Sequence, residues 1–171
     1  LLAGSIHVHA QSTQRLSLTT GGPGGVYQPL GSGIAELLSR HLPGLKVTAE
    51  ATQGSVDNLK LIGAGKADFG LSMVDAAWQA AEGLEPFRNM KVEPRTLLVL
   101  YPNRMQVVAS DRTGIRRLAD LKGKRVSTGA PGSGVEVMAL RVLESAGIDP
   151  KADLGQLRLG VAESVAALKD G

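Results

Sequence analysis

The sequence contains no cysteine, which excludes disulfide bonds, zinc sites with cysteine ligands and catalysis by a thiol. Aromatic residues are scarce, at two Tyr, two Phe and one Trp in 171 residues, so few rings are available for stacking on nucleic-acid bases. No apolar run approaches the roughly 18 residues that a membrane-spanning helix needs. The scarcity of rings argues against nucleic-acid binding, and the hydrophobic content of 43% predicts a globular protein, which we expect to be a monomer.

Catalytic motifs are also missing. No H-E-x-x-H, G-x-S-x-G or S-x-x-K pattern stands at a suitable turn. Of the three histidines, His7 and His9 lie in the N-terminal segment, and His41 stands near the expected end of a helix, where it is typical of a dipole partner. The sequence therefore predicts neither an enzyme nor a cofactor or metal site.

The first ten residues resemble the end of a signal peptide. Apolar residues lead to Val8-His9-Ala10, a small-x-small pattern that signal peptidase accepts. We interpret residues 1–10 as a signal-peptide remnant and predict export to the periplasm or another extracytoplasmic space. A first strand of the fold is the alternative interpretation.

Glycine is abundant, with 22 residues, and two glycine-rich loops each follow a predicted strand and precede a predicted helix. In the first half, Gly21–Gly25 lies between a strand and a helix that reaches His41, and Ser55 is the predicted N-cap of the next helix. The expected strands cover residues 15–19, 46–51, 68–72, 96–101 and 106–109, and the expected helices follow residues 25, 54 and 74.

The same order returns in the second half. Thr128-Gly129 lies 108 residues after Thr20-Gly21, and the segment from Gly160 to Gly171 echoes the segment from Gly54 to Gly65 at a spacing of 106. Strands are expected at 125–128 and 157–159, with helices after 134 and 160. We predict an α/β protein of two similar lobes, 11–103 and 104–171, the second incomplete at its C-terminal end. Chance recurrence of strand–helix units is the alternative.

Helix N-termini at glycine loops carry free N–H groups and a positive dipole end, which suit an anion. The two loops and the turn before Ser55 therefore form the candidate binding site. Neither loop fits a Walker A or dinucleotide-binding pattern. The residues at these three places that we predict to bind the ligand are Gly25, Tyr27, Thr52, Ser55, Asn58, Gly132, Ser133 and Gly134, and a family resemblance adds Met73, Asp75 and Val135.

Several segments in this order resemble the TAXI-type solute-binding subunits of TRAP (tripartite ATP-independent periplasmic) transporters. They are Leu18–Gly22, Val26–Gly31, Thr52–Leu59, Gly65–Asp68, Asp120–Val126 and Gly129–Gly134. The resemblance implies a periplasmic-binding-protein type II-like fold that closes over a small carboxylate such as glutamate, and membrane permease subunits as partners. A sensory module of the same fold, and an enzyme that binds phosphate esters, remain alternatives.

Several positions depart from the pattern of that family. Val26 and Val135 stand where threonine is frequent, and Met73-Val74 replaces Gln-Ser. Each lost hydrogen bond to a carboxylate costs on the order of 1 kcal/mol or more. We therefore expect a ligand less polar than glutamate.

Overall fold

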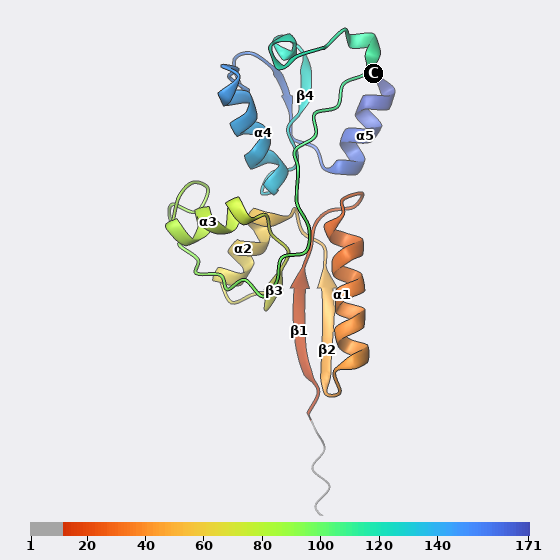
Figure 1. The fold of residues 1–171 in the computed structure, drawn as a ribbon, viewed down its shortest axis with the longest axis vertical. Coiled ribbons are helices and arrows are strands. Elements are labelled where there is room, and N and C mark those ends of the chain that lie inside the picture. The colour runs from red at the N-terminus through yellow and green to blue at the C-terminus, as the bar shows by residue number, and fades with distance from the viewer. Residues whose placement is uncertain (1–11) are drawn as a thin grey trace, which may run out of the picture.

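The computed structural model describes residues 12–171, so the proposed signal-peptide remnant lies outside the described part. Figure 1 shows two units, one above the other, joined by an extended connector. The lower unit contains β1 (Gln14–Thr19), α1 (Tyr27–His41), β2 (Leu45–Glu50), α2 (Ser55–Gly63), β3 (Phe69–Gly70) and α3 (Val74–Glu82). The upper unit contains two short 3₁₀ helices, η1 (Asp111–Thr113) and η2 (Leu118–Leu121). It also contains β4 (Arg125–Ser127), α4 (Gly134–Ser145), β5 (Gly155–Leu157) and α5 (Val161–Asp170).

The lower sheet is parallel, with strand order β2-β1-β3. Leu18, Ala35 and Val47 form the buried centre between this sheet and α1. A second cluster, around Leu59 and Phe87, joins α2 and α3 to the segment that follows them. The alternating apolar residues of β1 and β2 thus form the sheet side of this core, and the apolar stripe of α1 forms the helix side.

The upper sheet contains β4 and β5, also parallel. Leu121, Leu143 and Ile148 form its buried cluster. Both units therefore run strand, helix, parallel strand, helix, as the internal repeat predicts. Gly24 and Gly132, 108 residues apart, share the same left-handed φ of 82°, so the two glycine loops also match in backbone conformation. The boundary of the lobes at residue 103 stays a prediction.

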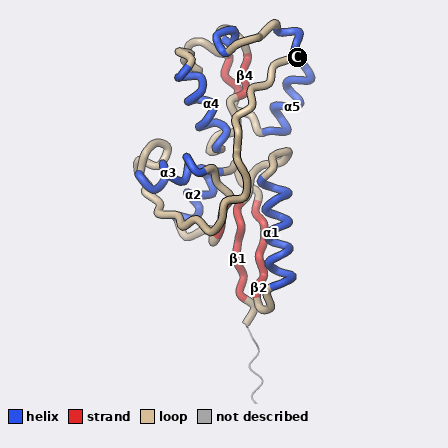
Figure 2. Tube along the Cα trace, viewed as in Figure 1, coloured by secondary structure: helices blue, strands red, loops and turns tan. Residues whose placement is uncertain are grey.

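The predictions of strands at 96–101 and 106–109 are wrong. This segment is an irregular, extended connector that climbs from the lower to the upper unit (Figure 2), and Leu97, Val99 and Val108 are exposed. Strand propensity describes how a side chain fits a sheet, and no neighbouring strand within residues 12–171 pairs with this segment. The strand expected at 68–72 is shortened to β3, and the one expected at 157–159 begins two residues earlier.

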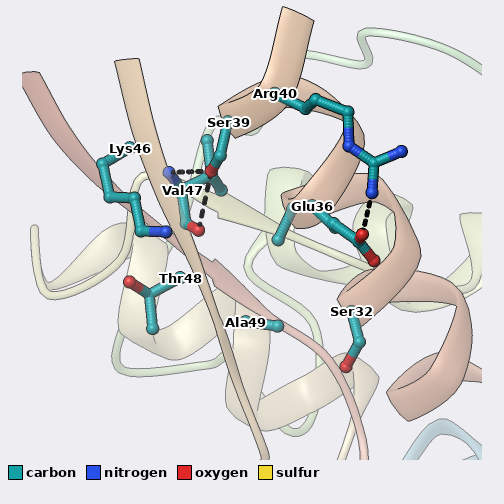
Figure 3. Close-up of a pocket in the computed structure, with 9 residues that line it drawn as sticks. Ser32, Glu36, Ser39, Arg40, Lys46, Val47, Thr48 and Ala49 are labelled. Atoms are coloured by element: carbon teal, nitrogen blue, oxygen red, sulfur yellow. Dashed lines mark hydrogen bonds and ion pairs between the residues drawn. The ribbon is translucent and has the colours of Figure 1, made fainter. Parts of the chain in front are cut away.

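A shallow hollow lies on the outer edge of the lower sheet, between α1 and the edge strand β2 (Figure 3). Ser39 Oγ accepts a hydrogen bond from the Val47 N–H at 2.8 Å and donates to the Val47 carbonyl at 3.2 Å. The helix thereby satisfies backbone groups that an edge strand would otherwise offer to another chain. This hollow lies away from both glycine loops, and we assign it a structural role.

Asp120, the first residue of the segment Asp120–Val126, stabilises a turn. The Asp120 carboxylate accepts hydrogen bonds from the backbone N–H groups of Arg116, at 2.9 Å, and Arg117, at 3.1 Å. These bonds, together with the Arg117 guanidinium, hold the pKa of Asp120 below its ordinary value. The carboxylate thus closes the turn that leads into η2.

We predict that Asp120→Asn destabilises the protein at pH 7 and that this effect fades in acid. A carboxyl whose pKa is lowered by folding stabilises the fold above its unfolded pKa, about 3.9, and the stabilisation is lost as pH falls through the lower folded pKa. Urea midpoints of parent and variant should therefore differ at pH 7 and converge once the pH falls below the lowered folded pKa of Asp120. Asp111→Asn, in the neighbouring η1, is the control, and an equal effect there would contradict the assignment.

Candidate functional site

A cavity of about 940 Å³ extends from the space between the two units over one face of the upper unit, and it is large enough for a small organic ligand. Glycine-loop residues Gly24 and Gly25 line it from the lower unit, and Ser133 and Gly134 line it from the upper unit. The connector from Met105 to Ser110 closes one side. The two loops therefore open onto one common space, as the repeated sequence pattern predicts.

Four helices begin at this space. In Figure 1 the N-terminal end of α1 points up toward the N-terminal end of α5, and α2 and α4 face each other in the same way. The two pairs are equivalent under the internal repeat, because α4 corresponds to α1 and α5 to α2. Each pair brings the positive ends of two helix dipoles together. The pairs differ in what satisfies their N–H groups.

The N-terminus of α2 binds a protein carbonyl. The N–H groups of Val56 and Asp57 donate to the Gly132 carbonyl of the upper unit at 3.1 and 3.2 Å. Gly54 takes the N-cap position of α2, and Ser55 is its first helical residue, so the prediction of Ser55 as N-cap is wrong. The Ser55 hydroxyl instead accepts a hydrogen bond from the Met73 N–H at 3.1 Å.

The N-terminus of α4 is capped by its own residues. Ser133 Oγ accepts from the Glu136 N–H at 3.1 Å, and the Glu136 carboxylate accepts from the Gly132 N–H at 3.3 Å. Glu136 is buried and paired with Arg158. A carboxylate so close to the glycine loop opposes a second anion at this helix end. The N-terminus of α5 carries an acidic residue as well, since Glu163 accepts from the Gly160 N–H at 2.9 Å.

The N-terminus of α1 has neither kind of cap. Its N-cap residue, Val26, provides no side-chain hydrogen bond, and its first turn contains no acidic residue. Gly25, Val26 and Tyr27 line the cavity. Among the helices that begin at the cavity, α1 therefore presents the least neutralised positive end to it.

Tyr27 connects α1 to its surroundings. Its hydroxyl accepts a hydrogen bond from the Asn103 amide of the connector at 3.5 Å, and its ring packs over Gly21, where an added Cβ would lie 3.1 Å from the Tyr27 Cβ. Burial raises the pKa of the Tyr27 hydroxyl above its ordinary value. The hydroxyl is therefore neutral at physiological pH and able to donate a hydrogen bond into the cavity.

The structure brings only part of the predicted site to the cavity. The predicted residues that line it are Gly25, Tyr27, Ser55, Met73, Ser133, Gly134 and Val135. The other four have structural partners. The Thr52 hydroxyl donates a hydrogen bond to the side-chain oxygen of Asn58 at 2.6 Å, and Asn58 is fully buried. Asp75 forms an ion pair with Arg141 at 2.7 Å, and the Gly132 carbonyl accepts hydrogen bonds from the N-terminus of α2.

Sequence reasoning missed the contribution of α5 and the connector. Gly160 and Val161 line the cavity at the N-terminus of α5, and Tyr101 and Asn103 line it from the connector. The repeat spacing of 106 places Val161 at the position equivalent to Ser55, and this signal was available in the sequence. The connector residues gave no comparable signal, because their place follows from the path between the units.

A family model described as the NMT1-like family matches residues 18–171. The chain belongs to the NMT1-like family. Two solved structures are similar to it in fold: the alkanesulfonate-binding protein SsuA from Xanthomonas axonopodis pv. citri, bound to MOPS, with a TM-score of 0.60 and 23% identity, and the periplasmic aliphatic sulphonate-binding protein SsuA from Escherichia coli, with a TM-score of 0.52 and 21% identity.

Both matches cover 94% of this chain and 52% of the SsuA chain, so this NMT1-like chain spans about half the length of those proteins. They confirm the prediction of an α/β fold of the periplasmic-binding-protein kind. The family match supports the coarser part of the resemblance, and the TAXI subtype stays a prediction. Within residues 12–171, no helix has the length and apolar character to cross a membrane, and no cluster of side chains suits a metal ion.

Proposed function

We propose that this protein is an extracytoplasmic solute receptor that binds a small organic anion between its two units. A single observation carries the proposal: the uncapped, acid-free N-terminus of α1 opens onto a cavity of about 940 Å³ to which both units contribute. Free backbone N–H groups and the helix dipole favour an anionic head there. The Tyr27 hydroxyl adds a neutral donor beside it.

The rest of the ligand meets less polar surroundings. Met73, Val135 and Tyr101 line the cavity. For Met73 and Val135, the resemblance to TAXI receptors implies that more polar residues are usual at these positions. We therefore propose a carboxylate with an apolar body in preference to glutamate. The SsuA proteins bind sulfonates, and a sulfonate head presents the same charge to a helix N-terminus, so sulfonates belong in the test.

Titration calorimetry of the purified protein tests the proposal. We expect hexanoate to bind at least tenfold more tightly than glutamate, because an apolar chain gains about 0.8 kcal/mol for each buried CH₂. Hexylamine, of similar length and opposite charge, is the control and should give no heat. Absence of binding for every carboxylate and sulfonate, at millimolar concentration, would reject an organic anion as the ligand.

Transport is the role that the family resemblance favours. We propose that the receptor delivers its ligand to a TRAP permease and makes or breaks no bond in it. Ligand recovered after overnight incubation with the protein should be chemically unchanged by mass spectrometry. Uptake of the bound anion by cells should require both this protein and its permease, and uptake that persists without the permease would contradict the assignment.

A further inference from the structure

The two contacts between the units are built very differently. We call the first the α2–α4 joint. In it, Gly132 and Gly134 of the upper unit contact the beginning of α2 and Met73, and Arg141 pairs with Asp75. The second, the α1–α5 contact, comprises Gly24 and Gly25 against Val161 and Ala162. The internal repeat makes them equivalent in position, yet within residues 12–171 only the joint is held by directional bonds.

Hydrogen bonds and an ion pair hold the joint. The Gly132 carbonyl accepts from two N–H groups of α2, at 3.1 and 3.2 Å, and Arg141 Nη1 lies 2.7 Å from Asp75 Oδ2. Separating the units here would break the two N–H bonds to Gly132 together and would leave a helix N-terminus without its carbonyl partner.

Close packing also holds the joint. A Cβ added at Gly132 would lie 2.6 Å from Asp57 Oδ1, and one added at Gly134 would lie 2.6 Å from both Ser55 Oγ and Met73 Sδ. Backbone from the upper unit therefore approaches side chains of the lower unit as closely as glycine permits. A close-packed surface of this kind resists small sliding movements.

The α1–α5 contact depends on van der Waals approach. A Cβ added at Gly24 would lie 3.1 Å from the Ala162 nitrogen, and one added at Gly25 would lie 3.9 Å from Val161 Cγ2. No hydrogen bond joins these two loops among residues 12–171. Val26 and Val161 beside the contact are exposed, at 61% and 46%. On the α1 side of this contact, the first turn of the helix contains no acidic residue, so the positive end of its dipole remains available to an anion.

We infer that the α2–α4 joint is a permanent pivot and that the receptor opens at the α1–α5 contact, so that ligand enters between Gly25 and Val161. This inference deepens the proposed function, because ligand binding is the event that closes the α1–α5 side. Loss of the anion leaves the α1–α5 contact without a directional bond and leaves the joint intact. The direction of opening therefore follows from which of two equivalent contacts has directional bonds.

Two pairs of engineered cysteines test this asymmetry in a protein that has no cysteine of its own. Ser55→Cys with Gly134→Cys reports the joint, since the Gly134 Cβ position lies 3.1 Å from Ser55 Cβ, and Gly25→Cys with Val161→Cys reports the other contact. Neither Gly25 nor Gly134 has a left-handed φ, so the backbone at both positions permits a side chain. At Gly134 the added Cβ displaces the flexible Met73 side chain, whose Sδ lies 2.6 Å from that position, and the Ser55→Cys sulfur replaces the hydroxyl there. Each variant in its reduced form is its own reference.

In the absence of ligand, we expect the joint pair to oxidise rapidly, at a rate that hexanoate does not change. The Gly25–Val161 pair should oxidise at least about tenfold faster with saturating hexanoate, because closure becomes the major state. Once oxidised without ligand, the Gly25–Val161 variant should lose binding and regain it on reduction. The oxidised joint variant should bind as its reduced form does.

The inference is overturned if the joint pair is the one whose oxidation responds to hexanoate, if both pairs respond equally, or if oxidation of the joint alone abolishes binding. These outcomes are separate from the fate of the proposed function. If no anion binds the parent protein, the ligand-free rates still decide the matter, since slow oxidation of the joint pair would itself reject a permanent pivot.

Discussion

Val26→Asp is expected to abolish anion binding while leaving the fold intact. Val26 is the N-cap residue of α1, is 61% exposed, and lines the cavity. A carboxylate at a helix N-terminus interacts favourably with the dipole, by about 0.3–1 kcal/mol, so stability should be kept or slightly raised. The same carboxylate occupies the positive end that the proposed ligand needs and repels its head. We expect the Kd for hexanoate to rise at least about 30-fold, equivalent to roughly 2 kcal/mol.

Val26→Asn separates charge from shape in this experiment. The amide resembles the carboxylate in size and carries no charge, so its effect on Kd should stay within about threefold. Calorimetry measures binding, and thermal unfolding of the same samples measures stability. A loss of affinity that is equal for Asp and Asn would show that polarity or shape, rather than charge, matters at α1. Unchanged binding in the Asp variant would move the anionic head away from this helix.

Asn58→Asp is expected to be the most destabilising single substitution proposed here, although it changes only one atom of the side chain. Asn58 is fully buried, and its amide nitrogen donates to the carbonyls of Thr20 at 2.6 Å and Leu71 at 2.7 Å. Its amide oxygen accepts from the Thr52 hydroxyl at 2.6 Å. The amide thus ties the loop after β1 to the end of β3 and to the turn before α2.

An aspartate at this position loses both donors and places an acceptor against two carbonyl oxygens. Each unsatisfied buried group costs about 1–3 kcal/mol, so we expect the free energy of unfolding to fall by about 3–5 kcal/mol. Urea denaturation at pH 7 measures the loss. Asn89→Asp, at an exposed position of the same unit, should change stability by less than about 0.5 kcal/mol. A small effect at Asn58 would mean that the buried network is not essential to the lower unit.

The helices and most strands were predictable because the apolar face that the local sequence pattern defines is the face that packs into the core. The stretches around Leu18, Ile34 and Leu143 each bury the face that their own periodicity defines. The connector was not predictable, since Leu97–Leu100 has the composition of a strand and the absence of a paired strand within residues 12–171 decided its conformation. The predicted site shows the same division. Gly25, Tyr27 and Ser133 follow from position at a loop–helix junction, whereas Asn58 and Gly132 have partners in other segments.

By itself, the sequence determined a repeated strand–loop–helix unit, a glycine loop before a helix in each repeat, and the α/β class of the fold. Those properties depend on residues within about ten positions of one another, where periodicity and glycine conformation act directly. Only the tertiary structure decided which helix N-terminus faces the cavity without a cap. That outcome depends on the Gly132 carbonyl reaching the N–H groups of α2, because a hydrogen bond to a distant segment leaves no mark in local sequence.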